Sequence, residues 1–180
     1  MTRSEALKLI QTHISTKNLV NHSLACEAIM RRLAKHFGED EELWGLAGLL
    51  HDLDYDYTKD KPEEHGYKTL EILGDSVSPE VKNAILAHCE KKVPETLMEK
   101  ALYAVDPTSG FIVAGALIKP ERKLSAIDVE FLMNRFKEKG FARGANREQI
   151  KSCENFGLSL EEFLSLALQA MQEIAGEIGL

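Results

Sequence analysis

Residues 46–54 read LAGLLHDLD, an apolar run that ends in His51 and Asp52 and continues to a second carboxylate, Asp54. An imidazole and a carboxylate at the end of a buried helix are costly to remove from water unless another group compensates them. A divalent metal ion can do so, because both side chains are good ligands for zinc, iron or manganese. The stretch therefore predicts a core helix with a metal site at its end, provided that partner ligands exist elsewhere in the chain.

The composition of the chain is that of an ordinary folded protein. Its 180 residues are 44% hydrophobic and 28% charged, enough for one domain with a substantial core. The net charge of −7 argues against a nucleic acid or an anionic membrane as the main partner. The three cysteines form no CxxC pair and are typical of free thiols in a reducing cytosol.

No segment of the sequence is typical of export or of membrane insertion. The first fifteen residues have helical amphipathic spacing without the apolar centre of a signal peptide. The longest central apolar stretch, 111–118, is too short to cross a bilayer, which takes about 20 residues. We therefore expect a soluble, cytoplasmic protein.

Apolar residues recur with helical spacing through almost the whole chain, and strand-like alternation is nearly absent. Glycines follow several expected helix ends, and the stretch from Ser159 to Glu162 has the pattern of a capping box. The fold class is predicted to be all-α, a bundle of packed helices in a single domain over 1–180. Helices are expected at 3–15, 18–37, 40–54, 63–74, 78–90, 95–117, 125–139, 146–155 and 159–177.

Six side chains of metal-ligand type fall on inward faces of these helices. His22 shares a stripe with Cys26 and Ile29, and His65 is expected in the first turn of a helix that Pro62 begins. Asp106 precedes Pro107, so its helix should either kink there or restart with Asp106 as the N-cap. The six are His22, His51, Asp52, His65, His88 and Asp106.

Each of these positions has an ordinary structural explanation. A single inward histidine is usually a hydrogen-bonded core residue, and a single aspartate on a helix is usually a cap. Six of them on five helices would each need a separate buried partner, whereas one metal site accounts for all of them. His13 and His36 lie near helix ends and are not assigned to the site.

With these residues in place, the chain resembles the HD superfamily of metal-dependent phosphohydrolases, which carry the pattern H…HD…H…H…D. The match is His22, His51-Asp52, His65, His88 and Asp106. The stretches LLHDLDYD (49–56), PEEHGYKTLEILG (62–74) and KALYAVDPTSGFIVAGAL (100–117) are similar to an HDIG-type subgroup of predicted HD hydrolases. The resemblance covers about residues 18–155, with flanking helices at both ends.

The resemblance implies a helical bundle with the metal site at its centre. His22, His51, Asp52 and Asp106 match the ligand set for one metal, and His65 and His88 match the extra histidines of binuclear members. In the binuclear form Asp52 would bridge the two metals. In the mononuclear form His65 and His88 would contact phosphate oxygens instead. The catalytic residues implied are Asp52, His65 and His88.

Four imidazoles and two carboxylates suit iron, manganese or zinc better than magnesium or calcium. We therefore expect a metal-dependent phosphohydrolase that cleaves a phosphomonoester or phosphodiester, most plausibly of a nucleotide, with two transition-metal ions. Two alternatives remain open. One is a diiron oxygenase of the HD type, and the other is a non-catalytic metal- or nucleotide-binding module. The amphipathic helix at 159–177 could pack in a dimer or in its own core.

The roles of several charged groups stay open at this stage. Asp54 is one helical turn from His51 and could either orient a ligand imidazole or face water. Candidate contacts for phosphate are the lysines beside the site and the basic loop 140–147, although each could be an ordinary surface charge. They are Lys59, Lys61, Lys91, Lys92, Arg143 and Arg147.

Overall fold

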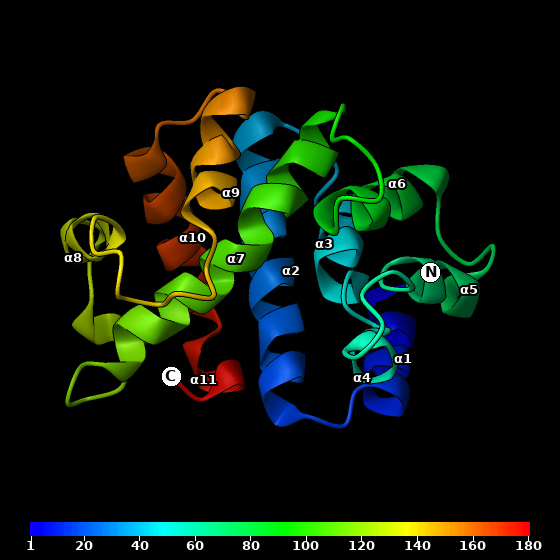
Figure 1. Ribbon diagram of the computed structural model, residues 1–180, viewed down its shortest axis with the longest axis horizontal. Coiled ribbons are helices and arrows are strands. Elements are labelled where there is room, and N and C mark those ends of the chain that lie inside the picture. The colour runs from blue at the N-terminus through cyan, green and yellow to red at the C-terminus, as the bar shows by residue number, and fades with distance from the viewer.

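Helix α2 (Lys17–Phe37) runs through the centre of the computed structural model, which describes residues 1–180. In Figure 1 it stands between α8, α10 and α11 on the left and α1, α3, α4, α5 and α6 on the right. No residue lies in a strand, so the prediction of an all-α fold is confirmed. The other α-helices are α1 (Arg3–His13), α3 (Glu41–Leu50), α4 (Tyr55–Thr58), α5 (Tyr67–Leu73), α6 (Pro79–His88), α7 (Leu97–Leu117), α8 (Val129–Phe136), α9 (Arg147–Lys151), α10 (Leu160–Glu173) and α11 (Ala175–Ile178), and the 3₁₀ turns are η1 (Leu124–Ala126) and η2 (Ser152–Phe156).

Side-chain caps fix several of the helix starts. The expected capping box is present at the start of α10, where Ser159 Oγ accepts from the backbone N of Glu162 at 3.2 Å and the Glu162 carboxylate accepts from the Ser159 N at 2.9 Å. At the start of α3, the Asp40 carboxylate accepts from two backbone amides at 2.9 Å. Such caps satisfy amides that have no partner inside the helix.

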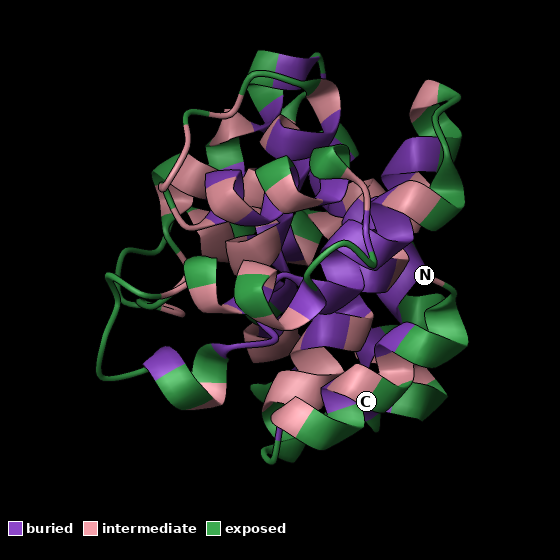
Figure 2. Ribbon diagram, turned by 90° about the vertical axis from the view of Figure 1, so that its right-hand side faces the viewer, coloured by how far each residue is buried: buried purple, intermediate pink, exposed green.

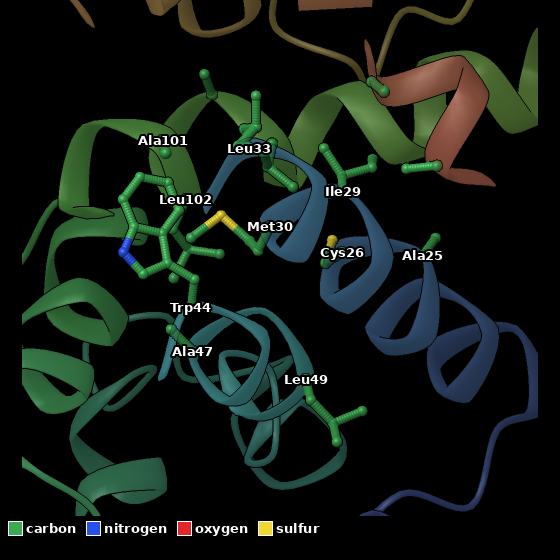
Figure 3. Packing of buried hydrophobic residues seen from close by; sticks show 14 of the residues in the cluster. Ala25, Cys26, Ile29, Met30, Leu33, Trp44, Ala47, Leu49, Ala101 and Leu102 are labelled. Carbon is green, nitrogen blue, oxygen red and sulfur yellow. The ribbon is translucent and has the colours of Figure 1, made fainter. Parts of the chain in front are cut away.

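The helices α2 and α3 cross at very short range, and this contact organises the core. A Cβ placed on Gly48 would lie 2.6 Å from the carbonyl oxygen of Cys26, so only glycine allows the two backbones to touch. Figure 3 shows Met30, Trp44 and Leu102 packed together beside this crossing. Figure 2 shows that the buried residues lie mainly on the interior helices. One continuous cluster of 42 buried residues extends from Ala6 to Ile178.

Several of the predicted helices, including those at 125–139 and 146–155, are shorter than expected, and two of the changes affect the candidate site. Helix α3 ends at Leu50, and residues 51–54 form turns that lead into α4. Pro62 does not begin a helix: residues 62–66 form turns, and α5 begins at Tyr67. Gly66 has φ +83°, a left-handed conformation that interrupts helical geometry at this point. The placement of His65 in a first helical turn was therefore wrong.

Helix α7 continues through Pro107 without restarting. A proline at this position removes the amide that would bond to the carbonyl of Tyr103, four residues earlier. The side chain of Gln149 replaces it, donating from Nε2 to the Tyr103 oxygen at 2.9 Å. Asp106 is thus held in mid-helix, and α9 is attached to α7 at the same point.

The remaining sequence expectations concern the end of the chain, the cysteines and membranes. Helix α10 buries Phe163, Leu164 and Met171 in the common core. All three cysteines are free. None of the helices has the length and apolar character needed to cross a membrane.

Candidate metal centre

Six side chains from five separate segments of the chain converge at one place beside α2. His22 comes from α2, and His51 and Asp52 directly follow α3. The others come from the turn before α5, the last residue of α6 and the middle of α7; they are His65, His88 and Asp106. All six residues that the sequence singled out are therefore neighbours in space.

The Asp52 carboxylate lies at the centre of this cluster, and its two oxygens face different histidines. Oδ2 lies 3.5 Å from Nε2 of His22 and 3.6 Å from Nε2 of His51. Oδ1 lies 3.4 Å from Nε2 of His65 and 3.4 Å from Nε2 of His88. Asp106 joins the first group, because its Oδ1 lies 3.2 Å from Nε2 of His22 and 3.8 Å from Nε2 of His51. Asp52 thus stands between two sets of donor atoms.

Backbone carbonyls orient two of the four imidazoles. Nδ1 of His51 donates to the Gly48 oxygen at 2.8 Å, and Nδ1 of His88 donates to the Ile85 oxygen. A carbonyl can only accept, so Nδ1 carries the hydrogen in both rings. When these rings are neutral, each Nε2 therefore presents a lone pair to Asp52, as metal-binding histidines do.

Asp54 orients His65. It is completely buried, so the alternative that it faces water is wrong. Its Oδ1 accepts from His65 Nδ1 at 2.8 Å, while its Oδ2 accepts from the backbone N of Gly66 at 2.8 Å and of Thr69 at 3.1 Å. The carboxylate therefore fixes both the turn that carries His65 and the direction of the His65 ring.

Ser109 orients His22, a role that the sequence analysis did not assign. Its hydroxyl donates to the Asp106 carbonyl at 3.0 Å and lies 2.8 Å from Nδ1 of His22. With its own hydrogen engaged, the Ser109 oxygen accepts from that nitrogen. The signal was its position, because Ser109 lies one helical turn after Asp106 on the same face of α7.

The arrangement fits bound transition-metal ions. When the four imidazoles are neutral, four lone pairs and two carboxylates point into one space. His88 Nε2 is buried without any hydrogen-bond partner, and the Nε2 atoms of His22 and His51 lie only 3.0 Å apart. Buried acceptors in this arrangement need protons or metal ions between them. Mixed nitrogen and oxygen donors suit zinc, iron or manganese.

Comparison with known proteins agrees with this geometry. The HD domain family matches residues 19–129, more than half of the chain and a stretch that contains all six side chains. The chain belongs to the HD domain family. The resemblance inferred from the sequence is thereby confirmed at the level of the family, while the HDIG-type subgroup stays a prediction.

One curated relative of this HD domain protein is Ribonuclease Y of Sulfurovum sp. (strain NBC37-1). The two are 33% identical over 94 residues, which is 52% of this chain and 18% of the relative. The chain thus corresponds to only a small part of that protein. No solved structure matches the chain.

Electrostatics within the HD site favour bound cations. Burial lowers the pKa of His51, but Asp52, Cys26 and Asp106 together outweigh this effect and raise the pKa to about 9. Burial likewise lowers the pKa of His22, and Cys26, Asp106 and Asp52 outweigh it and hold the pKa well above its usual value. Burial raises the pKa of Asp52, but the imidazoles around it bring the pKa well below its usual value. Without metal ions, protons are the cations that this site attracts.

Three of the six basic residues suggested for phosphate binding have other partners in this HD domain protein. Lys61 pairs with Glu64 at 3.1 Å, and Lys92 pairs with Glu95 and Glu99 at 2.9 and 2.8 Å. Arg147 donates to backbone carbonyls of the 136–145 segment and lies 4.7 Å from the centre of the Phe111 ring. Its role is to hold that loop in place. Lys59, Lys91 and Arg143 have no ion-pair partner.

Proposed function

We propose that this HD domain protein is a phosphohydrolase that binds two ions of iron, manganese or zinc. Its substrate is a phosphomonoester or phosphodiester, most plausibly of a nucleotide. His22, His51 and Asp106 would hold one ion, His65 and His88 the other, and Asp52 both. The observation that carries this proposal is the division of the Asp52 oxygens between two separate sets of imidazole nitrogens.

The side chains of the site divide into buried supports and an accessible edge. Asp106, His65 and His22 leave 31%, 21% and 19% of their side-chain surfaces exposed, whereas the His51 and His88 side chains leave 0% and 2%. A phosphate group can therefore approach from the side of the first three residues. Metal ions at such a site lower the pKa of a bound water and polarise a phosphoryl oxygen.

The division of roles among the residues follows from these contacts. Asp52 would keep the two ligand sets at a fixed separation, because each of its oxygens faces one of them. Asp54 and Ser109 would keep the Nε2 atoms of His65 and His22 aimed inward. In the mononuclear alternative, His65 and His88 would contact the phosphate oxygens directly, with Asp52, His65 and His88 again as the catalytic residues.

Two other functions would use the same donor atoms. A diiron oxygenase would consume dioxygen in the presence of its substrate, and a metal-dependent binding module would turn over nothing. The relative named Ribonuclease Y supports testing phosphodiesters, including RNA, beside monoesters. The net charge of −7 favours small esters over a long polyanion.

The decisive experiment is metal analysis of freshly purified protein, followed by a screen with the metal found for phosphate release from monoesters and for monoester formation from diesters. We expect about two ions per chain and hydrolysis that also proceeds without oxygen. Asp52→Ala should lose metal and activity, because it removes both carboxylate oxygens. The fully exposed Asp75 provides a matched control, Asp75→Ala, which should keep both. Undiminished hydrolysis by Asp52→Ala, or oxygen uptake without phosphate release, would overturn the proposal.

A further inference from the structure

A cavity of about 420 Å³ opens directly beside the candidate metal centre. It lies between the first turns of α2, the second half of α7 and the segment 178–180, and Figure 1 shows α11 beside the lower end of α2. Two of its lining residues, His22 and Ser109, also belong to the centre. A ligand that occupies the centre can therefore extend into this cavity.

The walls of the cavity combine apolar surface with unpaired polar groups. Val113 and Leu117 line it from α7, and Ile178 lines it from the opposite side. Asn21 fixes that opposite wall, because its Nδ2 donates to the Ile178 carbonyl at 2.9 Å. Asn18 makes no hydrogen bond with its side chain. The cavity thus offers an apolar slot with an amide free to bind a polar edge, which is typical of small-molecule sites.

Gly110 leaves the cavity open on the α7 side. A Cβ placed on it would meet no atom within 4 Å, so the helix does not need glycine there for packing. Any larger side chain at this position would instead take space beside the cavity that Gly110 lines. Gly110 thereby controls the size of the group that fits.

Part of the cavity comes from outside the stretch that matches the HD domain family. The family match begins at residue 19, after Lys17 and Asn18. It ends at residue 129, well before the wall formed by residues 178–180. The family match therefore does not account for this cavity. Lys17 is the only lysine or arginine on its lining and has no ion-pair partner, so the part of the cavity away from His22 suits a neutral or weakly anionic group.

We infer that this cavity binds the organic group of the substrate ester, a group of about nucleoside size, and that Gly110 sets its size limit. The inference rests on the proposed function, which places the phosphate at the metal centre. Small-molecule sites span roughly 300–1,000 Å³, so a cavity of about 420 Å³ has room for one such unit.

The test is a calorimetric titration of the metal-loaded protein with inorganic phosphate and with each of the four ribonucleoside 5′-monophosphates. We expect the best nucleotide to bind at least tenfold more tightly than phosphate. Gly110→Phe should remove this advantage and leave phosphate binding intact. Gly144→Phe is the matched control, because Gly144 also faces open space but lies in a turn that does not line the cavity. It should retain the advantage, and Val113→Trp, which narrows the same cavity, should repeat the loss.

The outcomes separate this inference from the proposed function. Equal affinity for phosphate and nucleotide in the unmodified protein, or unchanged nucleotide affinity in both Gly110→Phe and Val113→Trp, would overturn the inference while hydrolysis stands. Loss of nucleotide binding in Gly110→Phe, in a protein that hydrolyses neither phosphomonoesters nor phosphodiesters, would support the cavity and refute the proposed function.

Discussion

Glu27 and Asp52 are two buried carboxylates at the same pair of crossing helices, and their surroundings differ sharply. Glu27 accepts from Arg3 at 2.6 and 3.0 Å and from Arg31 at 2.9 Å. Asp52 faces four imidazole nitrogens and no arginine or lysine. The protein compensates one buried charge with its own permanent cations and leaves the other to cations from outside. This difference is the physical signature of a metal site.

The largest expected difference between the two regions is their response to metal removal. A metal at 100 times its dissociation constant should raise the free energy of unfolding by about 2.7 kcal/mol. Denaturant unfolding with the metal and with a chelator measures this increment. An increment of zero would mean that the cluster around Asp52 is stable without ions.

Glu27→Gln provides the control for this comparison. It should lower the free energy of unfolding by roughly 1–3 kcal/mol, because two arginines lose a charged hydrogen-bond partner. The increment from the metal should stay the same in this variant, since Glu27 contacts none of the six candidate ligands. A smaller increment would show that the two regions are coupled.

Asp54→Asn tests the His65 half of the centre. The side chain of asparagine has only one acceptor oxygen. It cannot accept from the imidazole and from two backbone N–H groups as the Asp54 carboxylate does, so the His65 ring should lose its orientation. We expect the affinity for one of the two ions to fall by about 10- to 100-fold, measured by metal titration. The matched control is Asp56→Asn, whose carboxylate accepts only from Ser15. Equal loss of both ions would assign Asp54 a role in the fold instead.

Taken over a single pH unit, the smallest expected effect is the change of metal affinity with pH. The pKa of His51 without metal is about 9, so at neutral pH the ring holds a proton that the metal must displace. The affinity should therefore fall by about tenfold for each pH unit below 9 for each proton displaced.

The sign for the metal-free protein is opposite. The pKa of His51 in the folded state is raised from 6.5 to about 9, so its contribution to stability is complete below pH 6.5 and is lost as the pH rises through 9. Unfolding and metal titration at pH 6, 7, 8 and 9 measure both trends. An affinity that does not change with pH would rule out displacement of protons.

Helical periodicity was sufficient to predict the inward direction of the candidate metal ligands that lie on regular helices. His22 and His88 lie on regular helices whose inward faces are marked by apolar residues, so their direction followed from spacing alone. The inward direction of Asp106 also followed from its spacing, although only the structure shows that α7 continues through Pro107. Local spacing could predict these residues because local backbone geometry fixes them.

His65 and Asp54 show where such reasoning ends. Pro62 is a good first residue for a helix, and only Gly66 in the local sequence opposes one. The turn exists because Asp54, eleven or more residues away, captures His65 and the amides of Gly66 and Thr69. Neither the shape of the turn nor the role of Asp54 is encoded locally, so both require the folded structure.

Gly48 has a consequence for protein engineering. Replacing helical glycines with alanine is a standard route to thermostability, and α3 also contains Gly45, whose added Cβ would lie 2.6 Å from Nε of Arg31, the atom that donates to Glu27. Gly48 is different, because the α2 backbone touches it and its carbonyl orients His51. Gly48 thus serves both the packing of the helices and the orientation of a candidate metal ligand, so a library built for thermal tolerance should leave position 48 unchanged.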